Sequence, residues 1–178
     1  MKRGTIGCGR SWIICGPKVA EFSQIAMVEP PRGMYPGKLD EKGRVKLPSV
    51  FQQYLDALRE KTLFVTSLDR HIAQIYPIAV WRRNEEFFAT KKEHAGLAGK
   101  VAFNAADLGA ETTMDAQGRV LFSPELRRAL NLEGTGLHLY AHNGRIEVLN
   151  DEVYEARRKA AMELTADDMA TLEAAGLN

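Results

Sequence analysis

The sequence predicts an α+β protein with a mostly β core, in which two copies of one small unit are related by a pseudo-twofold axis and flanked by helices. Three observations lead to this prediction: a repeat that aligns without gaps, an alternation of charged and apolar residues after a glycine turn, and a short amphipathic helix after each turn segment. The length of 178 residues, with 45% hydrophobic and 26% charged residues, fits one globular domain or two small ones.

The repeat is clearest between residues 39–47 (LDEKGRVKL) and 114–122 (MDAQGRVLF), which lie 75 positions apart. Asp, Gly, Arg and Val are identical in the two segments, and a proline follows shortly after each segment. Three weaker matches follow in the same order: residues 62–65 with 136–140, 72–76 with 146–149, and 80–81 with 153–154. Each copy therefore predicts a hairpin, a short helix, a second hairpin and a longer helix.

The glycines of the two segments, Gly43 and Gly118, predict tight turns, because glycine adopts positive φ without steric cost. After the first turn, Val45 and Leu47 alternate with charged residues. This period of two predicts a strand with one buried and one solvated face.

A short helix is predicted after each turn segment. In the first copy, Ser49 and Gln52 have the spacing of a capping box. In the second copy, Ser123 is the predicted N-cap and Pro124 the first helical residue. The predicted apolar stripes comprise Phe51, Tyr54, Leu55 and Leu58 in the first helix and Leu126, Ala129 and Leu130 in the second.

Units this small need a partner to bury their apolar faces, and the natural partner of one copy is the other. Strand edges that remain free favour further assembly, so we expect a homo-oligomer. Residues 82–105 predict a charged helix, a linker containing glycine and alanine, and another short helix. From Asp151 onward, the sequence predicts a mixed-charge helix with a solvated face.

Arg44 and Arg119 are the candidate DNA-binding residues, because arginine binds guanine edges and phosphates and a two-stranded ribbon fits the major groove. Asp40 and Asp115 are then expected to pair with them and hold each arginine in one rotamer. The alternative is that each Asp–Arg pair is only a structural ion pair across the turn. Three lysines near the first turn favour the nucleic-acid interpretation: Lys38, Lys42 and Lys46.

The enzymatic alternative is a dyad of Asp40 and Asp115, since two carboxylates in related halves can share a proton. The arginine four positions after each aspartate argues against this, because a neighbouring cation lowers the pKa of a carboxyl group. The sequence has no nucleophile elbow, P-loop or metal-ligand spacing. We therefore expect no enzyme activity, no metal, no cofactor and no small-molecule substrate.

The formal net charge of +1 argues against a protein that coats DNA by charge alone. The two cysteines, Cys8 and Cys15, both lie near the start, unlike the dispersed cysteines of a disulfide-stapled secreted domain. No apolar run approaches the roughly 20 residues of a transmembrane helix. These features predict a cytoplasmic protein that does not contact membranes.

Residues 32–48 and 114–120 closely resemble the two hallmark elements of the MraZ family of bacterial transcriptional regulators. The resemblance covers roughly residues 32–165 and implies two tandem SpoVT/AbrB-like swapped-hairpin modules that assemble into a ring, often octameric. It further implies binding to direct repeats in the promoter of the division and cell-wall gene cluster, at the nucleoid. The family's DNA-facing arginines match Arg44 and Arg119, and Arg32 joins the three lysines as a neighbouring candidate.

This resemblance divides the chain at residues 34–81 and 110–153, the two modules, with a helical linker at 82–109 and a helix and tail at 154–178. Residues 1–31 have no family counterpart, which indicates either an upstream choice of start codon or an additional arm. The alternative function is an antitoxin-like protein-binding module of the same fold group. Such antitoxins carry one module and a long unstructured arm, so two modules and a helical end favour the regulator.

Overall fold

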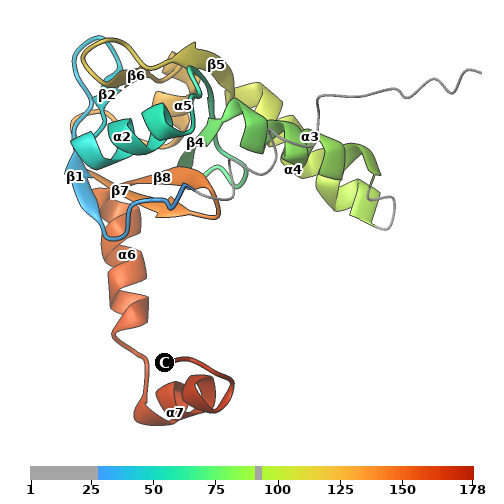
Figure 1. Ribbon diagram of the computed structural model, residues 1–178, viewed down its shortest axis with the longest axis vertical. Helices are drawn as coiled ribbons and strands as arrows, with labels where there is room; N and C mark the ends of the chain where they lie inside the picture. The colour runs from blue at the N-terminus through green and yellow to red at the C-terminus, as the bar shows by residue number, and fades with distance from the viewer. Residues whose placement is uncertain (1–27, 91–93) are drawn as a thin grey trace, which may run out of the picture.

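The computed structural model describes residues 28–90 and 94–178, so Cys8, Cys15 and most of the segment 1–31 lie outside the described residues. The protein has a six-stranded antiparallel sheet and a two-stranded antiparallel ribbon, with helices on both faces of the sheet (Figure 1). The strands are β1 (Tyr35–Gly37), β2 (Arg44–Lys46), β3 (Thr62–Thr66), β4 (Ala73–Pro77), β5 (Ala110–Thr113), β6 (Arg119–Leu121), β7 (Leu137–His142) and β8 (Arg145–Asn150). The helices are α2 (Ser49–Ala57), α3 (Ile78–Thr90), α4 (Ala95–Leu108), α5 (Pro124–Ala129), α6 (Asp151–Ala161) and α7 (Ala166–Ala174).

The strand order shows the pseudo-twofold relation between the two copies. The large sheet has the order β1-β7-β8-β4-β3-β5, which reverses when each strand is exchanged for its counterpart in the other copy. At the centre of this sheet, Gln74 is paired with Glu147. In the small ribbon, β2 pairs with β6 and Val45 lies opposite Val120. Both central pairs join equivalent positions, as a twofold axis through the two sheets requires.

Strands are exchanged between the copies. β1 of the first copy pairs with β7 of the second, and β5 of the second copy pairs with β3 of the first. The strands on either side of each glycine turn therefore pair with strands of the other copy, whereas the sequence predicted that they would pair with each other. In the first copy, the two sides of the turn are linked by the bridge between Leu39 and Val45 and by a hydrogen bond from the Asp40 N–H to the Arg44 carbonyl oxygen at 2.8 Å. The predicted α+β class with antiparallel sheets is confirmed.

The main core lies between the large sheet, the ribbon and helices α2 and α5. The predicted inward residues Val45 and Leu47 are 0% and 1% exposed, which confirms the alternation after the first turn. The opposite face of the sheet is covered by α3 and α4 through Trp81 and Ala105, and by α6. In Figure 1, α3 and α4 project to one side, while α6 leads away from the sheet to α7.

Local sequence signals determine how the helices begin, with two corrections. Ser123 caps α5 as predicted, since its Oγ accepts a hydrogen bond from the Leu126 N–H at 3.2 Å, and Pro124 follows at the first position. The capping box in the first copy is wrong: Pro48 occupies the N-cap position of α2 and offers no side-chain acceptor. In the apolar stripe of α5, Leu126 and Leu130 are buried as predicted, but Ala129 is exposed.

The segment after α3 also differs from expectation. The glycine- and alanine-containing stretch predicted as a linker is part of α4, a helix of 14 residues. Leu108, at the end of α4, packs into the main core, so tertiary contacts stabilise a helix that contains two glycines. Among the described residues, no helix is both long and apolar enough to cross a membrane.

Candidate nucleic-acid interface

The two turns of the repeat have the same backbone geometry. Gly43 N–H donates to the carbonyl oxygen of Asp40 at 2.9 Å, and Gly118 N–H donates to that of Asp115 at 2.9 Å. The φ angles of the two glycines are +77° and +73°, in the region that favours glycine. Both glycines therefore lie in tight turns with a left-handed backbone conformation.

Each aspartate organises its own turn. The Oδ1 atom of Asp40 accepts hydrogen bonds from the backbone N–H groups of Lys42 and Arg44, at 3.0 and 2.9 Å. Asp115 Oδ1 accepts the equivalent bonds from the residues two and four positions later, at 2.9 and 3.0 Å. Aspartate suits this position because its short carboxylate can reach backbone donors two residues ahead.

The second carboxylate oxygen holds the arginine side chain. Asp40 Oδ2 lies 2.8 Å from Arg44 Nε and 2.7 Å from Arg44 Nη2, while Asp115 Oδ2 lies 2.7 Å from Arg119 Nε. The two arginine side chains are 24% and 25% exposed. A guanidinium has five N–H donors, so donors remain for a ligand while the aspartate restricts the rotamer.

Antiparallel pairing of β2 with β6 brings the two Asp–Arg pairs together. Arg119 lies opposite Lys46 in this ribbon, and Arg44 Nη1 lies 3.9 Å from Asp115 Oδ2 of the other copy. The hydrogen bonds from Arg44 lower the pKa of Asp40 to about 2. Backbone and side-chain hydrogen bonds from Arg119 also lower the pKa of Asp115. Both aspartates are therefore ionised at neutral pH, so their carboxylates can hold the arginine side chains in one orientation.

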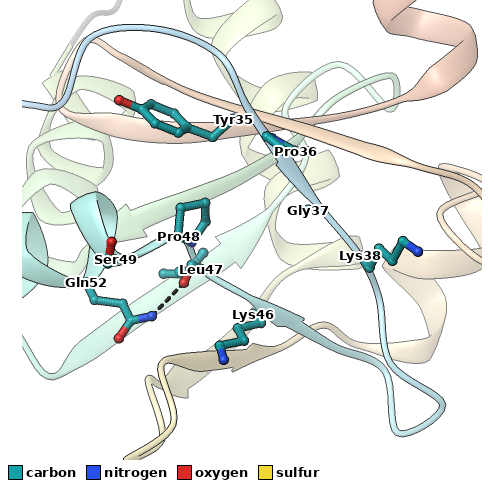
Figure 2. Close-up of a pocket in the computed structure, with 9 residues that line it drawn as sticks. All are labelled: Tyr35, Pro36, Gly37, Lys38, Lys46, Leu47, Pro48, Ser49 and Gln52. Carbon is teal, nitrogen blue, oxygen red and sulfur yellow. Dashed lines mark hydrogen bonds between the residues drawn. The ribbon is translucent and has the colours of Figure 1, made fainter.

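The predicted lysines surround the first turn. Lys42 is exposed within it, and Lys46 is exposed on β2. Lys38 directly follows β1 and is also exposed. Figure 2 shows that Lys38 and Lys46 flank an open groove between β1 and the start of α2. The groove is lined by Tyr35, Pro36, Gly37, Lys38, Lys46, Leu47, Pro48, Ser49 and Gln52.

Arg32 is the predicted site residue with a different environment. It precedes β1, is exposed, and forms an ion pair with Glu29 at 2.7 Å. Its charge is therefore partly balanced by an acidic neighbour. No group of three or more potential metal-binding residues lies together within residues 28–90 and 94–178.

Comparison with known proteins identifies the family. No family model matches the sequence. A MraZ transcriptional regulator from Acidobacterium capsulatum is 34% identical over 149 residues, which is 82% of this chain and 99% of the relative. The chain belongs to the MraZ family of transcriptional regulators. Similar MraZ proteins come from Koribacter versatilis, 31% identical over 78% of this chain and 97% of the relative, and Ralstonia pickettii, 32% identical over 70% and 84%.

Membership of the MraZ family confirms the resemblance found in the two turn segments. It also confirms that the protein is not an enzyme, because its relatives are transcriptional regulators. The geometry agrees: a catalytic pair of aspartates would need one carboxyl group with a raised pKa, whereas the pKa values of Asp40 and Asp115 are both lowered.

Two residues next to the turns of this MraZ protein were not predicted as site residues. Gln52 and Arg127 occupy equivalent positions in the two copies, each nine residues after the turn glycine. The sequence predicts only a capping role for Gln52, whereas in the structure its Nε2 donates to the carbonyl oxygen of Leu47 at 2.6 Å. The equal spacing was a signal in the sequence, although a glutamine and an arginine do not look alike.

Proposed function

We propose that this MraZ-family chain is a sequence-specific DNA-binding regulator whose paired turns enter the major groove and present Arg44 and Arg119 to base edges. The observation that supports this most is the juxtaposition of two aspartate-held arginines on one narrow ribbon. Arginine fixed in one rotamer loses less conformational entropy when it binds a guanine edge bidentately. The low pKa values keep the aspartates charged, so this orientation persists at neutral pH.

The lysines supply affinity rather than sequence information. Lys38, Lys42 and Lys46 are exposed around the first turn, where they can neutralise DNA phosphates and release counterions. Arg32 contributes in the same way once it leaves Glu29 for a phosphate. The second turn has Ala116 and Gln117 in place of charged residues, so the first turn carries most of the phosphate contacts.

The proposed target is a set of direct repeats in the promoter of the division and cell-wall gene cluster, at the nucleoid in the cytoplasm, where the protein regulates its own operon. Several protomers of a ring-like homo-oligomer, such as an octamer, would engage these repeats together and gain affinity through effective concentration. Exposed apolar side chains are available for contacts between protomers, including Leu97 and Phe103 of α4 and Met162 after α6.

The proposed organisation is two AbrB-like swapped-hairpin modules, at residues 34–81 and 110–153. The exchange of β1 and β5 between the copies supports this description. A toxin-neutralising module would instead carry one copy and an unstructured arm. Residues 151–174 here contain the helices α6 and α7, which favours the regulator.

The test is fluorescence anisotropy with a duplex from the gene's own upstream region, across a salt series, beside a random duplex of equal length. We expect Arg44→Ala and Arg119→Ala to weaken specific binding by roughly 1–3 kcal/mol each at a bidentate base contact. Arg128→Ala, which removes an exposed arginine from α5, is the matched control. Light scattering should show unchanged assembly in all variants. Equal affinity of the wild type for both duplexes would overturn the proposal.

A further inference from the structure

The two turns are attached to opposite copies by backbone hydrogen bonds. Leu47 N–H donates to the carbonyl oxygen of Gly118 at 2.8 Å, and Phe122 N–H donates to that of Gly43 at 2.9 Å. Leu47 and Phe122 occupy equivalent positions, directly after β2 and β6. Each turn therefore depends on the strand end of the other copy for its position.

A side chain reinforces each of these attachments from the carbonyl side. Gln52 Nε2 donates to the carbonyl oxygen of Leu47 at 2.6 Å, as Figure 2 shows, and Arg127 Nη1 donates to that of Phe122 at 2.7 Å. The same peptide segment thus gives its N–H to the opposite turn and its C=O to a helix of its own copy. This fixes the strand end that holds the turn.

The same two side chains lie directly against the opposite turn glycine. A Cβ added to Gly43 would lie 2.0 Å from Arg127 Nη1 and 2.5 Å from its Cζ. A Cβ added to Gly118 would lie 2.2 Å from Gln52 Cδ. Real Cβ atoms do not approach neighbours this closely. Each of these two positions therefore requires glycine, because a side chain from the other copy packs directly against its Cα.

We propose that Gln52 and Arg127 are positioning residues, each of which fixes the turn of the opposite copy and thereby the arginine beside it. Arg127 sets the Gly43 turn and so orients Arg44, while Gln52 sets the Gly118 turn and so orients Arg119. The role in DNA binding rests on the proposed function, but the attachment itself does not.

The two attachments are unequal. Arg127 is also held by Glu133, whose Oε1 lies 3.0 Å from its Nε, and its side chain is only 16% exposed. Gln52 is neutral, and within residues 28–90 and 94–178 its side chain forms one hydrogen bond, to Leu47. The first turn is therefore held by Arg127, which is anchored at two points, so we expect the first turn to be more rigid than the second. Because a more rigid turn orients its arginine better before binding, Arg44 should contribute more to sequence recognition than Arg119.

The structural test is amide hydrogen exchange of the whole chain in the absence of DNA, with NMR as the method that monitors the exchange of each residue. Arg127→Ala should accelerate exchange at Gly43 and Phe122 more than at Gly118, and Gln52→Ala should do the reverse. Arg127→Gln keeps a donor of the type used in the other copy and should restore most of the protection. Arg128→Gln is the matched control for loss of one charge on α5. Equal acceleration at both turns, or none, would overturn the positioning role.

The functional test uses the same variants in the anisotropy assay. Loss of one such hydrogen bond should weaken specific binding by about threefold to tenfold in Arg127→Ala. Arg127→Gln should remain close to Arg128→Gln. One outcome separates the two proposals: amide exchange accelerates at the turn of the opposite copy as expected, but neither the wild type nor any variant prefers the upstream duplex. In that case the positioning of the turns is supported, and the proposed sequence-specific DNA binding is overturned. If Arg127→Gln binds as poorly as Arg127→Ala, the arginine charge contacts DNA directly, and the positioning role is overturned.

Discussion

Arg44 lies between its own aspartate and Asp115 of the other copy: its Nη1 is 3.9 Å from Asp115 Oδ2, while its Nη2 is 2.7 Å from Asp40 Oδ2. Asp115 also binds Arg119 at 2.7 Å, so one carboxylate lies within reach of the arginines of both turns. This relationship exists only because β2 pairs with β6 in the register observed. The two turns therefore form one electrostatic unit rather than two independent ones.

Neutralising the shared carboxylate should lower sequence discrimination. In Asp115→Asn, both arginines lose a charged partner and sample more rotamers, while one negative charge near the DNA is removed. We expect severalfold tighter binding to random DNA and a smaller ratio of specific to random affinity. Asp107→Asn, which neutralises an aspartate paired with Arg70 at the end of α4, is the matched control. An unchanged ratio in Asp115→Asn would mean that this carboxylate does not orient the arginines.

The lowered pKa of Asp40 predicts acid sensitivity. Its carboxyl group has a pKa of about 2 in the folded protein and an ordinary value of 3.8, because it accepts hydrogen bonds from Arg44. A group with a depressed folded pKa stabilises the protein above its unfolded pKa and loses that contribution as the pH falls through the folded value. The difference in unfolding free energy between wild type and Asp40→Asn should be constant near neutral pH and shrink between about pH 4 and pH 2. Denaturant titrations at several pH values measure it, and a constant difference down to pH 2 would contradict the assignment.

Substitution of the turn glycines separates backbone strain from crowding. Gly134 has the same positive φ as Gly118, +73°, but nothing within 4 Å of an added Cβ. We expect Gly134→Ala to lower the unfolding free energy by about 1–2 kcal/mol, the usual cost of a left-handed conformation. Gly43→Ala and Gly118→Ala should cost about 1–3 kcal/mol more, because they also displace Arg127 and Gln52.

The crowding has its own check in a double-mutant cycle. Combining Gly43→Ala with Arg127→Ala removes the side chain that the new methyl group meets, so the two costs should not add. Urea unfolding of the four proteins gives the coupling free energy. Additive costs would mean that the turn relaxes away from Arg127 without resistance.

Local signals predicted much of each copy. The glycine turns, the burial of Val45 and Leu47 and the cap by Ser123 each depend on a few neighbouring residues, so one short segment determines each of them. The predicted cap of α2 is wrong because Pro48, and not Ser49, occupies the N-cap position. Pro48 is the counterpart of Ser123, the residue that caps α5. A repeat alignment carried through to this position would have shown the substitution.

Features that depend on the fold as a whole could not be predicted in this way. The exchange of strands needs knowledge of which edge each strand meets, and nothing within 39–47 specifies β6 as its partner. The sequence alignment of the two copies is also shifted by one residue in this region. It matches 72–76 with 146–149, whereas the pairing of Gln74 with Glu147 at the centre of the sheet shows that these two residues are equivalent. Leu63 and Gln74 are 11 positions apart in the sequence, whereas their counterparts Leu137 and Glu147 are 10 positions apart, and this difference of one residue explains the shift.

The final prediction compares equivalent aromatic residues on the outer face of the sheet. Trp81 of α3 packs against Phe64 with ring centroids 4.4 Å apart, and Tyr154 of α6 stacks on His138 at 3.7 Å. Trp81 is 6% exposed and contacts further aromatic rings, whereas Tyr154 is half-buried.

Trp81→Ala should therefore lower the unfolding free energy by about 3–5 kcal/mol, the usual cost of deleting a buried large aromatic side chain. Tyr154→Ala should cost about 1–2 kcal/mol, because less apolar surface is lost from a half-buried site. Denaturant unfolding at neutral pH, followed by far-ultraviolet circular dichroism, measures both. Because neither residue touches the turns, random-DNA affinity should stay at the wild-type value in each folded variant. Equal costs would mean that α6 is held on the sheet as firmly as α3, and that the two copies contribute equally to the stability of this face.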